Sequence, residues 1–220
     1  MKIAILGGTG EQGPGLALRW AKAGEEVIIG SRQKEKGEKV AVELNQELGK
    51  ELVQGTDNVT AAAAADIVVM TVPYSAHIAT LESVKEQCKG KIFVDVSVPL
   101  DPDNARRVVM PAAGSASEEA QQVLGQNVKV VCALQNISAH LLRDANAEID
   151  CDVLVCGEKN ARSSVIQLIN KIGGGIRAIN AGPLEAARQI EPITALLIRL
   201  NILNKVHSAG IRITGLPTAS

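Results

Sequence analysis

The sequence predicts an α/β fold of the Rossmann type: a doubly wound, mostly parallel sheet with a small α/β subdomain at the C-terminus. Three observations predict it. A glycine-rich turn joins the first strand to a helix, strand and helix patterns alternate along the chain, and the segment 66–73 is almost wholly apolar. A continuously apolar strand is typical of a parallel sheet that helices cover on both faces.

The first fifteen residues carry a dinucleotide-binding pattern. Residues 3–6 form a short apolar strand. Gly8, Gly10 and Gly13 follow it as Gly-x-Gly-x-x-Gly, and an amphipathic helix comes next. Gly8 allows the tight turn, Gly10 lets backbone N–H groups approach a pyrophosphate, and Gly13 lets the helix pack on the strand. The helix N-terminus supplies a positive end for the phosphates. A glycine-rich turn without a ligand is the alternative.

The second strand, residues 26–30, ends where a dinucleotide site distinguishes NAD from NADP. NAD sites usually place Asp or Glu here, about 20 residues beyond the glycines, to bind ribose hydroxyls. This chain has Ser31, Arg32 and, slightly later, Lys36. A hydroxyl and cations suit a 2′-phosphate, because Arg donates several hydrogen bonds from one plane and Lys acts as a point charge. We therefore predict NADP(H); basic residues that are merely solvated are the alternative.

The chain then continues to alternate strand and helix up to residue 136, which we take as the end of an NADP-binding domain, 1–136. The expected elements are a helix over 36–48, an extended segment over 52–59, a helix over 61–65, strands over 66–73, 91–97 and 129–134, and a helix over 76–88. A long connection precedes the strand at 129–134 and is expected to be functional or mobile. Residues 71–74 should face the cofactor, because ligands bind beyond the carboxyl ends of such strands.

Residues 137–220 are expected to form the small C-terminal subdomain. Its predicted elements are a short helix over 138–147, strands over 153–156 and 176–179, a helix over 161–172 and a long helical run over 184–206. The last run is apolar around most of its circumference, at Ile190, Ile193, Leu196, Leu197, Ile198, Leu200, Ile202 and Leu203. Such a helix must be covered on several sides, so we predict a homodimer contact here. Burial within one protomer is the alternative.

Composition excludes several classes of function. A net charge of -1 gives no electrostatic case for nucleic acid or an anionic membrane surface, so small-molecule partners are expected. The four cysteines contain no Cys-x-x-Cys pair, and we expect buried, reduced thiols. His77, His140 and His207 are spaced for neither a metal site nor a relay. With Met1 leading directly into a strand and no long apolar run, a cytoplasmic location is expected.

Several short segments together resemble one family of reductases. They are residues 7–10, 30–32, 72–73, 133–139, 151–157, 180–184 and 209–215. The combination looks like the NADPH-dependent reductases of coenzyme F-420, an 8-hydroxy-5-deazaflavin. The segments 181–184, Ala-Gly-Pro-Leu, and 209–215, Ala-Gly-Ile-Arg-Ile-Thr-Gly, are much narrower signals than the glycine motif. The resemblance covers nearly the whole chain.

The resemblance implies an oxidoreductase that transfers a hydride between NADP(H) and the deazaflavin, its co-substrate. The positions that would hold NADP are Thr9, Gly10, Glu11, Gln12, Ser31, Arg32 and Lys36. Ile137 and Ala139 match family positions beside the nicotinamide, and Ala209 matches one near the deazaflavin. Archaeal members carry His-Thr-Ile-Pro where this chain has Gln-Asn-Ile-Ser at 135–138.

The segments expected beside the nicotinamide end in small or aliphatic residues. They are Val72, Pro73, Val98, Leu134, Ile137 and Ala139. A flat apolar surface of this kind suits contact between two rings, and we expect residues 209–211 to close over it. Arg143, Arg188 and Arg212 are candidates to meet the anionic tail of the coenzyme. Pairing of these arginines with local acids is the alternative.

We expect no catalytic acid, base or nucleophile. Hydride passes between two rings whose reactivity belongs to the cofactors, so the protein needs to hold the rings at roughly 3–3.5 Å and exclude water. Two other functions stay open. One is a different NADP-dependent reductase, either a flavin-linked metal reductase or a short imine or keto-acid reductase. The other is a non-catalytic NADP-sensing module.

Overall fold

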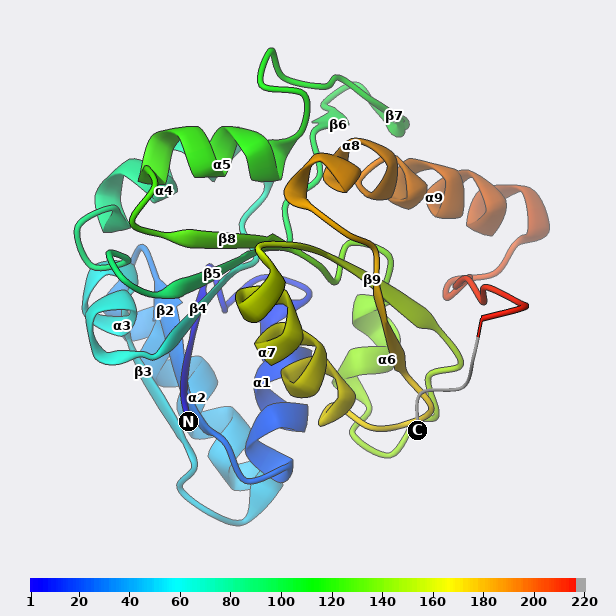
Figure 1. Cartoon of the computed structure of the whole chain (residues 1–220). Helices are drawn as coiled ribbons and strands as arrows, with labels where there is room; N and C mark the ends of the chain where they lie inside the picture. The colour runs from blue at the N-terminus through cyan, green and yellow to red at the C-terminus, as the bar shows by residue number, and fades with distance from the viewer. Residues whose placement is uncertain (217–220) are drawn as a thin grey trace.

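The structure, a computed structural model, describes residues 1–216. Its main sheet has eight strands (Figure 1): β1 (Lys2–Leu6), β2 (Glu26–Ser31), β3 (Val53–Asp57), β4 (Ile67–Met70), β5 (Ile92–Asp95), β8 (Lys129–Cys132), β9 (Asp152–Gly157) and β10 (Arg177–Asn180). Their spatial order is β10-β9-β8-β5-β4-β1-β2-β3. All pairs are parallel except β8 with β9. The predicted doubly wound, mostly parallel sheet is confirmed, with its topological switch point between β1 and β4.

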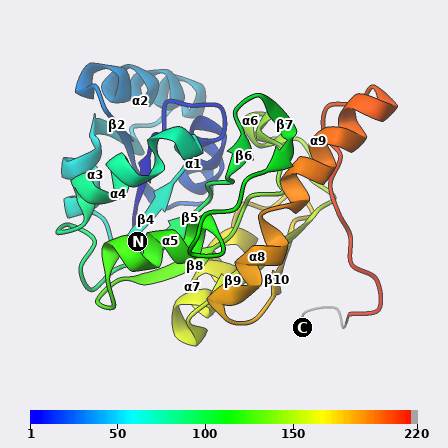
Figure 2. The same ribbon diagram turned by 90° about the horizontal axis from the view of Figure 1, so that it is seen from above.

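Helices cover both faces of the sheet (Figures 1 and 2). They are α1 (Gly13–Lys22), α2 (Lys34–Leu48), α3 (Asn58–Ala64), α4 (His77–Val84), α5 (Ala116–Leu124), α6 (Ala139–Arg143), α7 (Lys159–Asn170), α8 (Ala187–Ile190) and α9 (Ile193–Asn204), with 3-10 turns η1 (Tyr74–Ala76) and η2 (Leu184–Ala186). One core cluster joins α1, α2 and α7 to the sheet, and a second joins α3, α4 and α5 to the opposite face. Alternating crossovers of this kind are what cover both faces of a parallel sheet.

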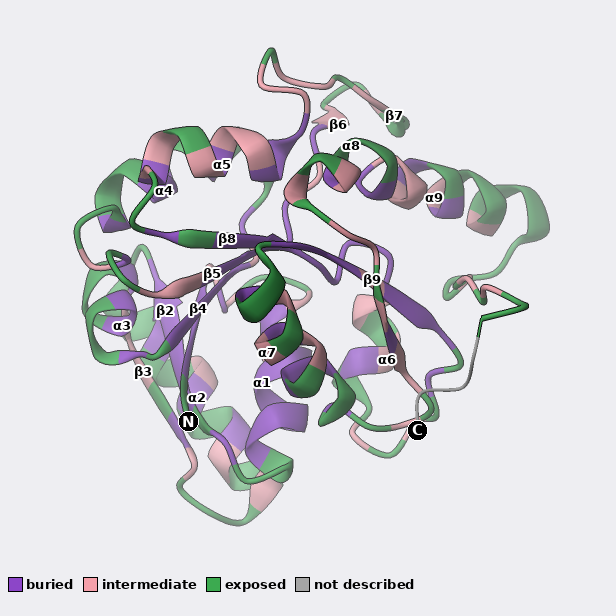
Figure 3. Ribbon diagram, viewed as in Figure 1, coloured by how far each residue is buried: buried purple, intermediate pink, exposed green. Residues whose placement is uncertain are grey.

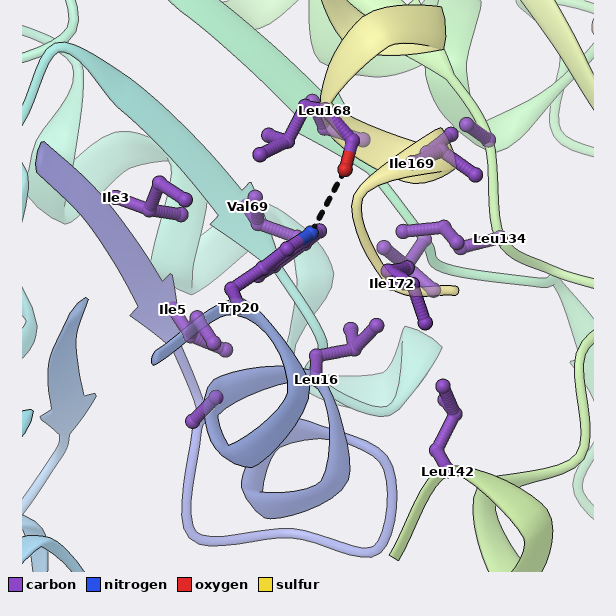
Figure 4. Packing of buried hydrophobic residues seen from close by; sticks show 14 of the residues in the cluster. Ile3, Ile5, Leu16, Trp20, Val69, Leu134, Leu142, Leu168, Ile169 and Ile172 are labelled. Atoms are coloured by element: carbon purple, nitrogen blue, oxygen red, sulfur yellow. Dashed lines mark hydrogen bonds between the residues drawn. The ribbon is translucent and has the colours of Figure 1, made fainter. Parts of the chain in front are cut away.

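Trp20 is the largest side chain of the first cluster (Figure 4). It comes from α1 and lies between Ile5 of the sheet and Leu168 of α7. Its indole Nε1 donates a hydrogen bond to the backbone oxygen of Leu168 at 3.0 Å, so the polar atom of this buried ring is satisfied. The tryptophan therefore links the N-terminal helix to the C-terminal part of the chain.

The C-terminal part continues the same sheet. The expected boundary at residue 136 falls in the loop after β8, and β9 and β10 extend the sheet beyond it. The helical run expected over 184–206 differs from the structure, which has η2, α8 and α9 in succession. Pro192 lies at the junction between α8 and α9, because its ring cannot continue a helix but is tolerated at the start of one.

The long connection before β8 is ordered. It contains a hairpin of β6 (Leu100–Asp101) and β7 (Asn104–Val108), followed by α5. The Ser115 side chain begins α5 by accepting a hydrogen bond from the Glu118 backbone N–H at 3.0 Å. The hairpin packs beside α9 (Figure 2). This hairpin and α5 are absent from the elements that the sequence predicted.

Burial separates the inner and outer residues of the fold (Figure 3). The strands at the centre of the sheet are buried, and all four cysteines are buried free thiols. In contrast, α9 buries only Ala195 and Leu197. None of the helices within residues 1–216 combines the length and the hydropathy that a membrane span requires.

Candidate functional site

One continuous groove lies at the carboxyl ends of the central strands. It consists of two cavities of about 590 and 600 Å³, which share Gly10, Val72 and Pro73. We call the first the basic half, because Arg32 and Lys36 line it, and the second the apolar half. The groove therefore lies at the switch point where open α/β sheets bind ligands.

The glycine turn forms the wall between the two halves. Gly7 has a φ of +67°, a conformation that glycine adopts without strain. A Cβ added to Gly13 would lie 2.5 Å from the Cα of Gly8, so the start of α1 packs directly on the turn. No side chain caps α1 at Gln12. The first amide groups of this helix therefore suit an anion such as a pyrophosphate.

The basic half has the chemistry that a phosphate monoester requires. The buried Ser31 ends β2, and the exposed Arg32 follows it; both line the cavity together with Lys36 from the first turn of α2. Lys34 differs from these residues, because it pairs with Glu38 at 3.5 Å and does not line the cavity. A hydroxyl and two cations thus meet at one end of the groove.

The apolar half is bounded by segments that are far apart in the sequence. Its lining consists of residues 10–12, 71–75, 96–98 and 100–102 with Gln135 and Thr194. Two hydrogen bonds fix its deep end. The Gln12 side-chain amide donates to the Leu134 oxygen at 2.9 Å, and the Thr194 hydroxyl donates to the Gln135 oxygen at 2.8 Å. Leu134 itself has a φ of +74°, an uncommon conformation for a side chain of this type.

Gln135 brings a buried polar side chain to the groove. Its side chain is 6% exposed, and its amide nitrogen donates to the Asp95 backbone oxygen at 2.8 Å. Its Oε1 is buried without a hydrogen-bond partner among the described residues. A buried acceptor without a donor costs free energy, so this oxygen is a locally unfavourable feature at the edge of the groove.

The structure brings many of the predicted cofactor-binding residues to the groove. Thr9, Ser31, Arg32 and Lys36 line the basic half; Glu11, Gln12 and Val98 line the apolar half; and Gly10, Val72 and Pro73 line both. The other predicted residues lie behind or beside this surface. They are Gly8 and Gly13 inside the turn, the buried Leu134 and Ile137, Ala139 at the start of α6, and Ala209 in the C-terminal segment.

The C-terminal segment, residues 209–213, is held along β9 by Asp152. This buried carboxylate accepts hydrogen bonds from Arg177 (2.7 and 2.8 Å), from Arg212 (2.7 Å) and from the Ile213 backbone N–H (2.7 Å). Burial opposes ionisation of Asp152, but these donors outweigh it and lower the pKa of the group to about 2. Asp152 is therefore the main charged anchor of the segment, and backbone contacts such as the Asp152 N–H to the Ile211 oxygen at 2.8 Å add to it.

Each arginine that the sequence offered for the coenzyme tail pairs with an acid. Arg143 lies 2.8 Å from Glu47, and Arg188 makes two hydrogen bonds to Glu118 at 2.8 and 2.9 Å. Arg212 pairs with Asp150 as well as with Asp152. This is the arrangement that the sequence analysis left as the alternative.

Several groove residues were missed by sequence reasoning. Asn58 lines the basic half, and its side-chain oxygen accepts the Gly7 N–H at 3.2 Å. Thr194 and the β6–β7 hairpin contribute to the apolar half, whereas Tyr74 lies there as the prediction for residues 71–74 required. The signal for Asn58 was available, since it follows a strand. Thr194 carried no comparable signal, because it lies in an apolar helix and reaches the groove only through the fold.

Comparisons with known proteins agree with this site. The family described as NADP oxidoreductase, coenzyme F420-dependent, matches residues 2–99. The F420-dependent NADP reductase of Methanothermobacter thermautotrophicus is 48% identical to this chain, covering 99% of it and 96% of that protein. The reductase of the same name from Methanocaldococcus jannaschii is 46% identical, with coverage of 98% and 99%.

A solved structure agrees over the whole fold. It comes from Arthrobacter sp. FB24, and the protein is proposed to be an F420-dependent NADP-reductase. It superposes with a TM-score of 0.82 at 29% identity and covers 97% of this chain and 99% of that one. Identity near one half over almost the full length, together with the shared fold, shows that this chain belongs to the family of F420-dependent NADP reductases.

Proposed function

We infer that the protein transfers a hydride between NADP(H) and the 8-hydroxy-5-deazaflavin coenzyme F-420. The observation that carries this inference is the continuity of the groove, in which a basic half passes directly into an apolar half of about 600 Å³. That volume is typical of sites for small molecules and cofactors. The family to which the chain belongs supports the same pair of substrates.

In this proposal the two halves have separate tasks. Ser31, Arg32 and Lys36 hold the 2′-phosphate, and the turn at Gly10 with the start of α1 holds the pyrophosphate. Val72, Pro73 and Val98 flank the rings and exclude water. The reduced nicotinamide supplies the hydride and the deazaflavin accepts it, so the residues need to orient the rings rather than exchange protons with them.

We assign the remaining predicted residues to the proposed site because of the segments in which they lie. Leu134, Ile137 and Ala139 flank the lining residue Gln135 in the chain. Ala209 begins the segment held by β9, and its backbone N–H donates to the Asn201 side chain at 2.9 Å. We place this segment near the deazaflavin on the basis of the family resemblance.

A spectrophotometric assay tests the function directly. Adding NADPH and enzyme to oxidised deazaflavin should bleach its visible absorbance catalytically. The proposed acceptor is rejected if no bleaching occurs in either direction at any pH at which the protein is folded and binds NADP. In that case another hydride acceptor must use the apolar half.

We propose a homodimer that forms through α9. This helix exposes four apolar side chains, Leu196 (52% exposed), Leu200 (37%), Ile202 (57%) and Leu203 (70%), of which Leu196, Leu200 and Leu203 share one face. A groove of about 340 Å³, lined by Ile198, Ile202 and Val206 among others, lies along another face of the same helix. Contiguous exposed apolar surface of this kind usually marks an interface.

Light scattering should therefore give about twice the protomer mass of 23.1 kDa. The variant Leu203→Glu should dissociate the dimer, because it places a charge in the apolar contact. Val42→Glu is the matched control, since Val42 is 55% exposed but lies on α2. A single-protomer mass for the unmodified protein at micromolar concentration would contradict the proposal.

We place the protein in the cytoplasm, with small molecules as its partners. The four cysteines support this location, because all are buried thiols without a disulfide, as expected in a reducing compartment. The near-neutral net charge of -1 supports small-molecule partners rather than nucleic acid.

A further inference from the structure

A fully buried histidine lies directly behind the apolar half of the groove. His77 begins α4 and has no exposed surface. Its Nε2 lies 2.9 Å from an oxygen of Asp95 in β5, and its Nδ1 lies 3.1 Å from an oxygen of Glu119 in α5. Both ring nitrogens therefore meet carboxylates that come from two other elements of the fold.

This geometry fits a protonated ring. A neutral imidazole has one N–H and one acceptor nitrogen, so it cannot donate to two carboxylates at once. Burial by itself lowers the pKa of His77, but Asp95 and Glu119 outweigh burial, and the pKa lies above its ordinary value. His77 is thus a buried imidazolium between two acids.

The same network reaches both sides of the groove. Tyr74, which lines the apolar half, donates its hydroxyl to the Glu119 oxygen that also faces His77, at 2.9 Å. Asp95 is the last residue of β5, and its second oxygen accepts the Ser97 backbone N–H at 3.0 Å. Ser97 also lines the apolar half. One imidazole ring therefore joins the wall that follows β4 to the wall that follows β5.

We propose that His77 is a positioning residue for hydride transfer: its protonated ring, bonded to Asp95 and Glu119, holds the two walls of the apolar half at the separation that the stacked rings require. The proposal rests on the proposed function, because it assigns a task in that reaction. His77 does not line the groove, so in this proposal it contacts neither cofactor and acts through the lining residues Tyr74 and Ser97. A misplacement of about 1 Å in such a wall is enough to lower the rate of transfer about 100-fold.

The proposal predicts a dependence on pH. The two carboxylates that face its ring nitrogens favour the protonated form, and because they raise the pKa of His77, that form is lost at a higher pH than for an ordinary histidine. We expect the rate of hydride transfer to fall on the alkaline side, while NADP(H) affinity in the basic half changes little. The ionisable groups around the ring are Asp95 from β5, Glu119 from α5 and Tyr74 from η1.

A third carboxylic acid lies close to this network. Glu191, at the end of α8, accepts hydrogen bonds from the backbone N–H groups of Ala116 and Ser117 at 2.8 and 3.0 Å. Burial raises the pKa of Glu191 to about 7, so its titration must be separated from that of His77. The variant Glu191→Gln serves this purpose, because it removes the titrating carboxyl group while it keeps one of the two oxygens that accept these N–H groups, and it should retain the alkaline fall in rate.

Nitrogen-15 NMR of histidine-labelled protein tests the charge of the ring without using activity. The chain has three histidines, and His140 and His207 are exposed, so the spectrum is simple. We expect His77 to carry protons on both nitrogens at neutral pH. A neutral ring with a single tautomer at neutral pH would overturn the proposal.

Single-turnover kinetics with NADPH and oxidised deazaflavin test the positioning role. His77→Phe leaves Asp95 buried without its partner and is liable to unfold, so the informative variants are Glu119→Gln and Tyr74→Phe. Glu119→Gln removes one of the two acids that raise the pKa of His77, so the alkaline decrease in the rate of hydride transfer should occur at lower pH. Tyr74→Phe keeps the charge of His77 but removes the hydrogen bond from the Tyr74 hydroxyl to Glu119, so the wall that follows β4 loses its link to the histidine. Both should lower the rate about 10-fold with NADP(H) affinity unchanged.

Glu82→Gln is the matched control, because Glu82 is exposed on α4 and should leave rate and pH profile unchanged. If Glu119→Gln lowers the melting temperature but leaves the rate and its pH profile intact, His77 is a packing residue and the proposal is wrong. If the unmodified enzyme does not reduce the deazaflavin at all, the proposed function fails and this role fails with it. The NMR result then still reports the charge of His77.

Discussion

Replacing Arg32 with alanine should weaken NADP(H) binding by about 10- to 150-fold while leaving NAD(H) binding almost unchanged. The range follows from hydrogen bonds to charged groups, which contribute about 1.5–3 kcal/mol each. Arg32 lines the basic half beside Ser31 and Lys36. Because NAD(H) lacks the 2′-phosphate, it does not use this contact. Calorimetric titration of both cofactors gives the two affinities.

Lys34→Ala is the control for the loss of a positive charge at this position of the fold. Lys34 is a near neighbour in sequence, but it pairs with Glu38 and does not line the groove. We expect it to change NADP(H) affinity little, since exposed ion pairs contribute about 0–1 kcal/mol. Equal affinity of the unmodified protein for NADP(H) and NAD(H) would show that Ser31, Arg32 and Lys36 do not form a 2′-phosphate site.

Replacing Asp152 with asparagine should free the C-terminal segment and destabilise the fold by about 3 kcal/mol. The estimate follows from removing one partner of a buried ion pair, which leaves the other charge uncompensated. Two guanidinium groups depend on this carboxylate, those of Arg177 and Arg212. Urea unfolding of variant and parent measures the change in the free energy of unfolding. The deazaflavin should bind more weakly and NADP(H) about as before, as should also follow from truncation before Ala209.

The same variant should alter the response to acid. The pKa of Asp152 is lowered to about 2, so its contribution to stability is complete above the unfolded value of about 3.9 and is lost as the pH falls through about 2. Asp152→Asn should therefore show less acid-dependent loss of stability. Asp150→Asn is the matched control, because Asp150 is 83% exposed and binds only Arg212. Equal effects of the two substitutions would contradict the anchoring role of Asp152.

Two arginines, Arg32 and Arg212, show which contacts can be predicted from the sequence. Arg32 was assigned to NADP from its place after a strand, and the structure puts it in the basic half. Arg212 was assigned no definite partner, and the structure pairs it with Asp150 and Asp152, about sixty positions earlier in the chain. The first assignment depends on the order of neighbouring residues. The second depends on which strands lie side by side.

Helix boundaries show the same difference between what local sequence predicts and what it does not. The helix over 34–48 was predicted nearly to its ends, because its pattern and the terminal Gly49 are local signals. The run over 184–206 was expected to be continuous, and the break at Pro192 was missed. Apolar residues around that whole run concealed the break, since hydrophobic pattern alone does not separate one long helix from two short ones.

The sequence by itself determined most of the individual strands and helices, the glycine turn and the position of the basic half. These features follow from residues that lie within a few positions of each other, so local geometry is enough to specify them. Only the tertiary structure decided the apolar half, the anchoring of the C-terminal segment and the network of His77, Asp95 and Glu119. The contacts of His77 and Asp152 join residues 18 to 61 positions apart, and that of Gln12 with Leu134 joins residues 122 positions apart. Burial changes the charge state of such groups only once the elements that carry them have packed together.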